Sequence, residues 1–556
     1  MKKLLFILLG LIGLGVIVAQ GPGPIPPQIL YDQVGVWSAN QFFTSVDNVV
    51  YCDQYAILNL CYAALPGGHG KMILPPNTTI DQTTSLAIST SNVTMECPSW
   101  NTVIQRDSSL TGAQQLISVT GTNFLIRDCT IDGGSFANTG IDLNLDGAND
   151  VAEHIQAINS GNISVSVSGA NSILDDSTIT GLGSTTIGGY GVWAINHQTV
   201  SITNNKISFT KLDGIGFDGF GSQVVGNHVF SAHCYNTGGG GVIATYPNAV
   251  NVVIANNTIG PGCSYVAHGI ELNGFSETVT GNAISHQWSN GISVDTGHGP
   301  GGVNITANTI MDSSALSSND DYGINFQSSS VSTINITGNI LGDDQTTIST
   351  ACVGTVAVGA QTCTVTSGGT TGLEYGSNIS IAGAGVAGAA LVTYLNSINT
   401  LGNTITWNTA TSTATTSPAV TGVATQQYGI HIPSGAYNQL NITGNMFFGN
   451  VAGPISNGAT GVNQIIKNNI GIDDIIPSVA SAAALAFPLN PIIALTGTTG
   501  VTSITGPVWD GREVKMIPAG SVTFTAGNNI ANTVTTTQNV PLTATYASGA
   551  GLWYLK

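Results

Sequence analysis

Two acidic residues near the middle of the chain have the types and spacing needed to act together on a glycosidic bond. Glu271 lies in the segment HGIELN, and Asp295 ends the segment NGISVD. If these segments are adjacent parallel strands in register, the acidic residues are displaced by two positions and their Cα atoms are roughly 8 Å apart. Carboxyl groups on such backbones can reach the separation used by retaining or by inverting glycosidases. We therefore predict Glu271 and Asp295 as a catalytic pair, flanked by His268 and His298.

Polar and aromatic residues at related positions of the neighbouring segments are candidates for binding a substrate. They are Trp193, Asp218, Asn273, Trp288, Asn325 and Gln327. Among them, Trp288 could offer a flat face to a sugar ring. Lys211 and Asp213 lie near Asp218, and the simplest interpretation of this cluster is a surface ion pair beside a turn. The alternative for the whole set is a solvated outward face, because carboxylates in a cleft suggest a site without defining one.

One stretch has the residue pattern of a calcium-binding loop. The segment DLNLDGANDVAE matches Asp-x-Asn-x-Asp-Gly-x5-Glu, in which alternating oxygens surround a hard cation. The candidate ligands are Asp142, Asn144, Asp146, Asp150 and Glu153. The alternative is a strand with outward Asp142 and Asn144 followed by an Asp-Gly turn, since Gly140 and Ile141 also begin a strand-like segment.

A repeated unit of roughly 25 residues would position these side chains. Each unit contains one piece of the form x-Gly-Ile/Val-x-apolar and another of the form Asn-x-Ile/Val, and the Asn positions 205, 227, 257, 282 and 308 recur every 22 to 30 residues. Strand-like repeats of this length stack as coils of a solenoid, whereas an antiparallel sandwich would not need the same residue at each corner. We predict an all-β parallel β-helix with Gly and Asn at its corners and stacked Asn side chains along its axis.

Alternation along each strand gives the unit two inward and two outward columns of side chains. The inward columns are predicted as Val192, Ile215, Val242, Ile270, Ile292, Ile324, Ile430 and as Ala194, Phe217, Ala244, Leu272, Val294, Phe326, Ile432. The outward columns are predicted as Asp142, Trp193, Gly216, Ile243, Glu271, Ser293, Asn325, His431 and as Asn144, Ile195, Asp218, Thr245, Asn273, Asp295, Gln327, Pro433. Most candidate site residues therefore share one outward face, a shallow groove suited to a chain-like ligand.

The segment before the repeats resembles the N-terminal cap of a known superfamily. Residues 52–80 read as a short helix with Ala56, Leu60 and Ala64 on one face, a Gly-rich turn, and a strand ending in Leu-Pro-Pro before Asn-Thr. With the repeats, this resembles the pectate-lyase-like superfamily of right-handed parallel β-helices, which includes pectin-degrading lyases and hydrolases and phage tailspikes. The resemblance covers roughly residues 40–345 and 425–475. It implies a polysaccharide or cell-surface glycan as partner, and the tailspike members suggest a homotrimer.

Two specific activities of this superfamily do not fit the chain. A pectate lyase uses Arg or Lys as base beside calcium-bound uronate, but the central coils offer only Lys206 and Lys211. A polygalacturonase carries Asn-Thr-Asp, Asp-Asp, Gly-His-Gly and Arg-Ile-Lys in series, of which Gly-His-Gly at 297–299 and scattered Asp-Asp pairs occur here. The formal charge of −18 would repel a polyuronate, so a neutral glycan is favoured, and without a basic patch nucleic acid is not expected as a partner.

The N-terminus and the cysteines indicate export. Lys2 and Lys3 precede an apolar run to Val18, which predicts a secretory signal peptide cleaved before Gln20 rather than a membrane anchor. The eight cysteines are then expected to form disulfides within neighbouring couples, namely Cys52–Cys61, Cys97–Cys129, Cys234–Cys263 and Cys352–Cys363. We expect a secreted protein, or one on the surface of a cell or virion, that is not held by a membrane after cleavage.

The predicted organisation has six segments. Residues 1–19 are the signal peptide, 20–40 a Pro/Gly-rich leader, 41–344 the N-terminal cap and β-helix, 345–424 an inserted β-rich module, 425–476 the final coils, and 477–556 a linker with a C-terminal β-rich module. Both modules resemble small β-modules of phage tail and surface proteins. The terminal one would cover strand edges that an open solenoid exposes.

Two functions are open on the sequence alone. One is a secreted protein that binds and depolymerises an extracellular neutral polysaccharide in the groove, as a glycoside hydrolase or polysaccharide lyase. The other is a tailspike-like or adhesin-like protein that binds surface glycan without cutting it. The pair Glu271 and Asp295 favours the first, and the phage-type modules favour the second. Calcium is the one cofactor expected.

Overall fold

The computed structural model describes most of the chain from residue 48 to residue 556. The ranges without a description are 1–47, 56, 137–139, 183–188, 196–197, 234–239, 262–266, 288, 296, 300, 314–321, 329–330, 345–348, 367–377, 400–402, 424–425, 461–462 and 474–475. The predicted signal peptide, the Cys234–Cys263 couple and Trp288 therefore lie outside the described residues. Of the helices in the described part, none is both long and apolar enough to cross a membrane.

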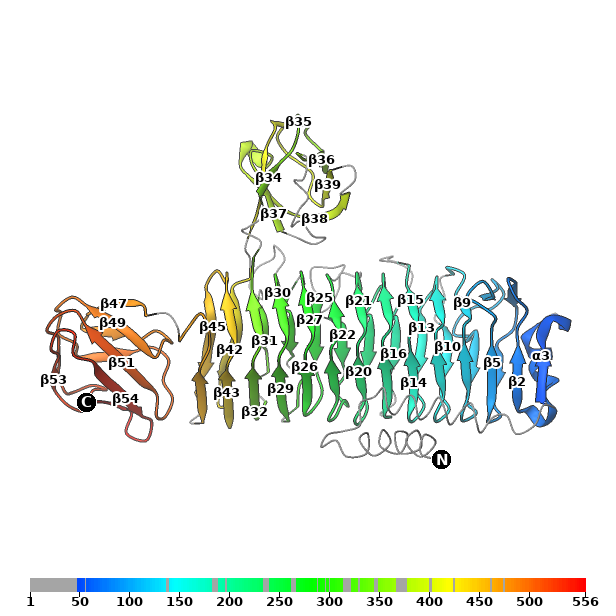
Figure 1. The fold of residues 1–556 in the computed structure, drawn as a ribbon, viewed down its shortest axis with the longest axis horizontal. Helices are drawn as coiled ribbons and strands as arrows, with labels where there is room; N and C mark the ends of the chain where they lie inside the picture. Colours follow the sequence, from blue (N-terminus) through cyan, green and yellow to red (C-terminus); the bar gives the residue numbers. More distant parts are fainter. Residues whose placement is uncertain are drawn as a thin grey trace, which may run out of the picture.

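The chain winds into a parallel β-helix whose coils each contribute one strand to each of three sheets, as Figure 1 shows. Sheet C comprises β4 Leu86–Ile88, β7 Ile117–Val119, β10 Ile141–Leu145, β13 Ile163–Val167, β16 Val192–Ala194, β19 Ile215–Phe217, β22 Gly240–Thr245, β25 Ala267–Leu272, β28 Ile292–Val294, β31 Tyr322–Phe326, β42 Tyr428–Gly435 and β45 Gly453–Ala459. The predicted all-β parallel solenoid is confirmed.

Sheets A and B complete each coil. Sheet A comprises β1 Val49–Tyr51, β2 Gly70–Ile73, β5 Val93–Glu96, β8 Leu125–Arg127, β11 Val151–Glu153, β14 Ser172–Asp175, β17 Val200–Thr203, β20 Gln223–Val225, β23 Val253–Ala255, β26 Glu277–Thr280, β29 Gly302–Thr306, β32 Thr333–Thr337, β43 Gln439–Thr443 and β46 Gln464–Lys467. Sheet B comprises β3 Thr79–Gln82, β6 Val103–Arg106, β9 Thr130–Asp132, β12 Gln156–Ile158, β15 Thr178–Thr180, β18 Lys206–Ser208, β21 His228–Phe230, β24 Thr258–Ile259, β27 Ala283–Ser285, β30 Thr309–Met311, β33 Ile340–Gly342 and β44 Met446–Phe448.

A short helix covers the N-terminal end of the stack. Helix α3, Leu58–Ala63, lies between the 3-10 turns η2 Cys52–Gln54 and η3 Pro66–Gly68. It buries Leu58 and Cys61, while Leu60 is 52% exposed, so the predicted apolar face through Leu60 is wrong. The disulfide Cys52–Cys61 fixes the helix to the preceding turn, and Cys97–Cys129 joins two coils. Together with Cys352–Cys363, these bonds confirm three of the four predicted couples.

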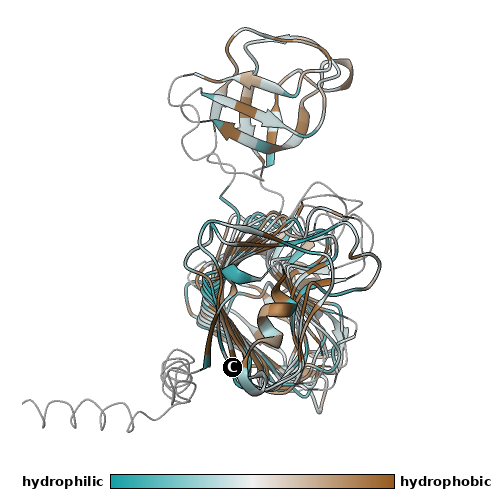
Figure 2. Ribbon diagram, turned by 90° about the vertical axis from the view of Figure 1, so that its right-hand side faces the viewer, coloured by the Kyte–Doolittle hydropathy of each residue, from teal (hydrophilic) through white to brown (hydrophobic). Residues whose placement is uncertain are grey.

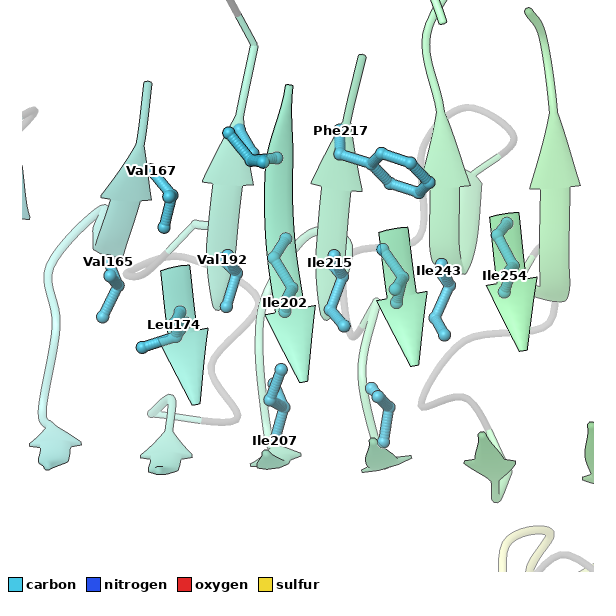
Figure 3. Close-up of a cluster of buried hydrophobic side chains, with 14 of the residues drawn as sticks. Val165, Val167, Leu174, Val192, Ile202, Ile207, Ile215, Phe217, Ile243 and Ile254 are labelled. Atoms are coloured by element: carbon cyan, nitrogen blue, oxygen red, sulfur yellow. The ribbon is translucent and has the colours of Figure 1, made fainter. Parts of the chain in front are cut away.

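The core is a set of apolar columns that run along the stack. In sheet C the register joins Val192 to Ile215, Ile215 to Ile243, and Ile243 to Ile270, and Figure 3 shows the first three side chains in one row. The predicted column contained Val242 in place of Ile243, and that assignment is wrong by one residue. Several consecutive glycines, up to Gly241, could each be the Gly that begins the repeated unit. Val242 and Ile243 are both aliphatic and both fully buried, so the hydrophobic pattern is compatible with either alignment.

A buried ladder of Asn side chains runs along the corner between sheets A and B. The Nδ2 group of each ladder residue donates to the Oδ1 of the next, for example from Asn227 to Asn257 at 3.0 Å and from Asn257 to Asn282 at 2.9 Å. The same Nδ2 of Asn257 also donates to the Val224 carbonyl at 2.9 Å. The predicted stacking is therefore confirmed, but the left-handed corner residue is the one before the ladder Asn, such as Asn256 with φ 54°.

Removing one Asn from this ladder is expected to destabilise the stack. In Asn257→Ala, the backbone N–H and Nδ2 of Asn227 and the Val224 carbonyl lose partners inside the protein. We expect a loss of about 1–3 kcal/mol in the free energy of unfolding, measured by denaturant titration. The exposed Asn101→Ala should change it by less than about 0.5 kcal/mol. Equal effects of the two substitutions would contradict a structural role for the ladder.

The repeat is interrupted between β33 and β42 by an antiparallel sheet with its own apolar core. This sheet contains β34 Ser349–Ala351, β36 Thr362–Thr364, β37 Asn378–Ile381, β38 Leu391–Asn399, β39 Thr404–Trp407 and β41 Ala419–Gly422, accompanied by the pair β35 Thr355–Val356 and β40 Thr415–Thr416 and the 3-10 turn η5 Val386–Gly388. Seen along the axis in Figure 2, it stands to one side of the stacked coils.

A further set of strands with its own core follows the last coil. These strands are β47 Ser478–Ala480, β49 Ile492–Thr496, β51 Glu513–Pro518, β54 Leu542–Ala547 and β55 Leu552–Leu555 in one sheet, with the pairs β48 Ala484–Ala486 and β50 Ser503–Thr505, and β52 Thr523–Phe524 and β53 Val534–Thr535. Strands β47, β49 and β51 pair in parallel, whereas β51, β54 and β55 are antiparallel.

Candidate functional site

A hollow opens on the outer face of sheet C, lined by residues of strands β22 and β25 and of the loops next to β16, β19, β22 and β25. The register places Trp193, Gly216, Ala244 and Glu271 side by side on successive coils. The space over Gly216 is taken by the rings of Trp193 and Tyr246, whereas the small Ala244 leaves room beside Glu271. The resulting cavity has a volume of about 160 Å³, and its polar lining consists of Tyr190, Asp213, His233, Thr245, Tyr246, Glu271 and Asn273.

The correction at β22 explains why this cavity exists. The predicted outward column held Ile243 between Gly216 and Glu271, and an isoleucine there would fill the space. In the structure Ile243 faces the core and Ala244 faces outward. Thr245 in turn pairs with Phe217 in the register, and its Oγ1, at the base of the cavity, accepts a hydrogen bond from the Asn273 N–H at 2.8 Å.

Glu271 is a buried carboxyl group at the edge of the cavity. It is 8% exposed, and Asn273 Nδ2 donates to its Oε1 at 3.1 Å. Burial raises the pKa of Glu271 to about 7; the hydrogen bond from Asn273 opposes this rise, and the charges of Asp213 and Asp295 add to it. Near neutral pH a substantial fraction of Glu271 therefore carries a proton. With Oε1 occupied by Asn273, that proton is available on Oε2.

Asp213 is a second carboxyl group in the same cavity, held in a different way. Its Oδ1 lies 3.1 Å from His233 Nδ1, and its Oδ2 accepts a hydrogen bond from the Tyr246 hydroxyl at 2.9 Å. Two partners on the two oxygens suit the acceptor-only carboxylate form. The side chain is buried, so the sequence-based interpretation of Asp213 as part of a surface ion pair is wrong.

An aromatic wall closes one side of the cavity. The rings of Tyr190 and Trp193 lie 3.9 Å apart between centroids, and Trp193 meets Tyr246 edge to face at 5.1 Å. Gly216 makes room for them, because a Cβ there would lie 3.0 Å from the Trp193 ring and 3.2 Å from the Tyr246 ring. Burial and the charge of Asp213 raise the pKa of Tyr246, so its hydroxyl stays protonated as a donor. Trp193 packs behind the two tyrosines and is not itself part of the cavity lining, so its role as a substrate contact stays a prediction.

The predicted partner of Glu271 lies on the next coil, as expected. Glu271 pairs with Ser293, two residues before Asp295, so the predicted displacement is confirmed. Asp295 is half-buried and acts on Glu271 through its charge. His268 is buried, and its Nδ1 lies 3.3 Å from the Asn290 N–H, an acceptor geometry. Burial lowers the pKa of His268 to about 4, so its ring is neutral at pH 7.

His298 and Asp218 are not on the accessible face. His298 Nε2 lies 3.2 Å from Glu277 Oε2, and both side chains are fully buried. Asp218 is also fully buried. The prediction that His298 flanks the catalytic carboxylates and the prediction that Asp218 contacts substrate are therefore both corrected, because both side chains are buried in the protein.

Two other predicted binding residues continue the outer face of sheet C beyond Asp295. Asn325 Oδ1 lies 2.8 Å from His431 Nδ1, and Gln327 Nε2 donates to Ser293 Oγ at 3.3 Å. The ring of His431 stacks on Tyr322 at 4.5 Å. Their role as substrate contacts stays a prediction.

The five residues of the calcium motif do not converge on one point. Asp142 is buried against Arg106, Asn144 donates to Gln115, and Glu153 lies 3.8 Å from Arg127 on sheet A. Asp146 is exposed, and Asp150 is buried with its Oδ1 accepting from the Phe124 N–H at 2.9 Å. Within the described residues no three His, Cys, Asp or Glu side chains are grouped as metal ligands. The motif is thus a strand and turn, and calcium binding itself stays a prediction.

Sequence reasoning missed His233, Tyr190 and Tyr246. All three lie in loops or next to strand ends, where the repeat imposes no residue type. Their one signal was chemical: His and Tyr side chains that flank the strands β16 and β22 or lie in the loop before the glycine run.

Comparison with known proteins finds structural similarity alone. No family model matches the chain, and no curated protein matches it. The Dettilon tailspike protein is 13% identical over 68% of this chain and 94% of that chain, with a TM-score of 0.38. The A-module of a mannuronan C-5 epimerase from Azotobacter vinelandii is 13% identical over 78% and 98%, with a TM-score of 0.45. The catalytic unit of an α-1,3-glucanase from Streptomyces thermodiastaticus is 17% identical over 53% and 69%, with a TM-score of 0.36. These values say nothing about activity, and the β-helix assignment rests on the strand pairing itself.

Proposed function

We propose that this protein binds a neutral extracellular polysaccharide on the outer face of sheet C and hydrolyses it in the cavity lined by Asp213, Tyr246 and Glu271. The observation that supports this most is the presence of two carboxyl groups with contrasting environments in one cavity beside an aromatic wall. Glu271 is desolvated with one oxygen bound by Asn273, and Asp213 accepts on both oxygens. Such a pair suits general acid and base roles at a glycosidic bond.

In the proposed reaction Glu271 is the acid. Its Oε2 proton passes to the glycosidic oxygen as the bond from that oxygen to the anomeric carbon breaks. Asp213 accepts a proton from the water whose oxygen forms the new bond to the anomeric carbon, so one water is consumed for each bond cut. His233 and Tyr246 hold Asp213 in place, and Trp193 offers its ring to a sugar. Asp295 is proposed to support the raised pKa of Glu271 rather than to act on the bond.

A lyase reaction is less well supported. It needs a base for the proton next to a uronate carboxylate and a cation or donor to neutralise that carboxylate. Among the described residues that line the cavity, none is Lys or Arg. Burial and Asp213 also raise the pKa of Tyr246, which makes its phenol a poor base.

A polysaccharide panel tests the proposal. Soluble dextran, galactomannan, xyloglucan and laminarin serve as neutral probes, and alginate and polygalacturonate as anionic ones. New reducing ends without absorbance at the wavelength of unsaturated products would show hydrolysis. Asp213→Asn should reduce the rate by at least about 100-fold, because a base cannot be replaced by an amide.

Asp107→Asn is the matched control, since Asp107 lies in a loop remote from the cavity and hydrogen-bonds Ser109. It should cleave like the parent. Binding of a probe without release of reducing ends would favour the tailspike-like or adhesin-like alternative. Cleavage by Asp213→Asn at the parent rate would place the chemistry elsewhere.

A further inference from the structure

Phe209 occupies a backbone position that does not suit it. It directly follows β18 and has φ 56°, in the left-handed region. The residues that directly follow five other sheet B strands share this conformation, namely Asn159, Ser231, His286, Asp312 and Gly449. Small or polar residues tolerate this conformation far better than a bulky aromatic one. Phe209 is nevertheless 44% exposed, so the strained backbone is not compensated by burial of the ring.

Phe209 is part of an exposed aromatic group on two adjacent coils. Its ring meets Phe230 edge to face at 6.0 Å, and His228 lies 5.0 Å from Phe230 between centroids. Lys206 Nζ lies 5.8 Å from the Phe230 ring centroid. We call Phe209, Phe230, His228 and Lys206 the aromatic step.

Among the described residues, the neighbours of Phe230 on the adjacent coils of sheet B are small. The register of β21 with β24 places Gly260 beside Phe230, and a Cβ there would lie 3.0 Å from the Phe230 Cβ. On the other side Phe230 pairs with the small Ser208. An apolar ring between small residues, edged by a cation and an imidazole, offers a stacking surface with hydrogen-bonding groups around it.

The step is joined to the cavity by two short loops. Asp213 is four positions after Phe209 in the chain, and His233 is three positions after Phe230. Their Cα atoms are therefore within about 14 Å and about 11 Å of each other. A glycan with one linkage in the cavity can reach the step within a few sugar units.

We infer that the aromatic step is a second sugar-binding subsite, which stacks a unit of the same glycan chain whose scissile linkage occupies the cavity. This inference rests on the proposed function, because the ligand is the polysaccharide proposed above. The step extends the binding surface around the corner from sheet C to sheet B. Lys206 and His228 would donate hydrogen bonds to sugar hydroxyls, and the Phe rings would pack against the C–H faces.

Affinity electrophoresis in gels that contain each of the six polysaccharides tests the subsite. Variants are made in a Glu271→Gln background, so that the probe is not cut during the measurement. Phe209→Asn and Phe230→Ala should each raise the Kd for the polysaccharide that the parent binds by about tenfold. Phe220→Ala is the matched control, since Phe220 is 61% exposed at another corner, and it should bind like the parent.

A thermal melt separates a binding role from a structural one. Phe209→Asn should raise Tm by about 2 °C because Asn suits the left-handed backbone, while it weakens binding. With wild-type Glu271 restored, the same variant should cleave a short aryl glycoside of the same sugar at the parent rate.

The outcomes distinguish the subsite from the proposed function. If the parent cuts a polysaccharide and both Phe variants bind it unchanged, the subsite is wrong and the proposed function stands. If Phe209→Asn lowers Tm, Phe209 is a packing residue and the subsite is again wrong. If the parent neither binds nor cuts any probe, the proposed function fails and the subsite fails with it.

Discussion

Glu271→Gln is expected to lose polysaccharide cleavage by about 10²–10⁴-fold and to keep its affinity for the polysaccharide, because the amide keeps the shape but cannot deliver the proton. In the wild type the protonated acid is the active form. Activity should therefore fall as pH rises through about 7, the pKa to which burial raises Glu271. Initial rates from pH 4 to pH 9 and binding to the uncut polysaccharide check both points.

Asn273→Ala tests the assignment of Glu271 as the acid, because it should change the pKa of Glu271 without removing its carboxyl group. The hydrogen bond from Asn273 Nδ2 lowers the pKa of Glu271, so its removal should move the alkaline limb of the rate profile to higher pH. A purely structural role for Asn273 would lower the rate without moving that limb. An unchanged rate in Glu271→Gln, or a profile flat between pH 6 and pH 8, would contradict the role of Glu271 as the acid.

The raised pKa of Glu271 also determines how the stability of Glu271→Gln compares with that of the wild type. The folded-state pKa of Glu271 is raised from 4.5 to about 7, so its contribution to stability is fully present below 4.5 and is lost as pH rises through 7. The neutral Gln does not lose a proton. We therefore expect the variant to be at least as stable as the wild type at pH 8, so a loss of cleavage there cannot be attributed to unfolding.

The solenoid could be predicted because its physics is repeated in each coil. Ile215, Ile270 and Ile292 occupy equivalent positions, and the Asn ladder repeats one hydrogen-bond geometry along the axis. Each coil thus gives separate evidence for the same arrangement of core and corner residues. The predicted register fails at β22, where consecutive glycines and two buried aliphatic residues, Val242 and Ile243, made two alignments equivalent. It also fails by two residues at β10, where Asn144 rather than the predicted Asp142 aligns with Trp193 through Ser166.

The site could be predicted in part, because only part of it lies on strands. Strand alternation correctly placed Trp193 and Glu271 on one outer face. It could not indicate that Asp213 and His233, from two different corner loops, would meet at 3.1 Å. A loop carries no periodicity, and its path depends on what the adjacent coil leaves open. The same reason explains His298, which is buried against Glu277.

Alternation also could not predict how deeply an outward residue is covered. Glu271 faces outward from sheet C yet is 8% exposed, because loops and large side chains from neighbouring coils surround it. This burial is what raises its pKa, so the chemical property that suits it to catalysis is set by its neighbours in space rather than by its own strand. Sequence position identified the residue, and only the packing around it identifies the role.

A buried ion pair on the N-terminal coils should show the largest effect on stability. The Arg106 guanidinium is fully buried: its Nε and Nη2 lie 3.1 Å and 3.0 Å from Asp142 Oδ1, and it also donates to the carbonyls of Leu110, Gln114 and Ile141. Arg106→Met would leave Asp142 buried without its cation, and we expect a loss of about 3–5 kcal/mol at pH 8. Denaturant unfolding measures the change.

The pH dependence of that loss identifies its cause. Burial already raises the pKa of Asp142 to about 6, with Arg106 opposing the rise, so removing Arg106 must raise it further. At pH 5 Asp142 in the variant is then protonated and no longer a buried charge, and the loss should be clearly smaller than at pH 8. Arg127→Met is the control, because Arg127 pairs with Glu96 at the half-exposed surface of sheet A and should cost at most about 1 kcal/mol at either pH. Equal losses for the two arginines, or a loss for Arg106 that does not change with pH, would show that the orphaned carbonyls rather than the carboxylate dominate.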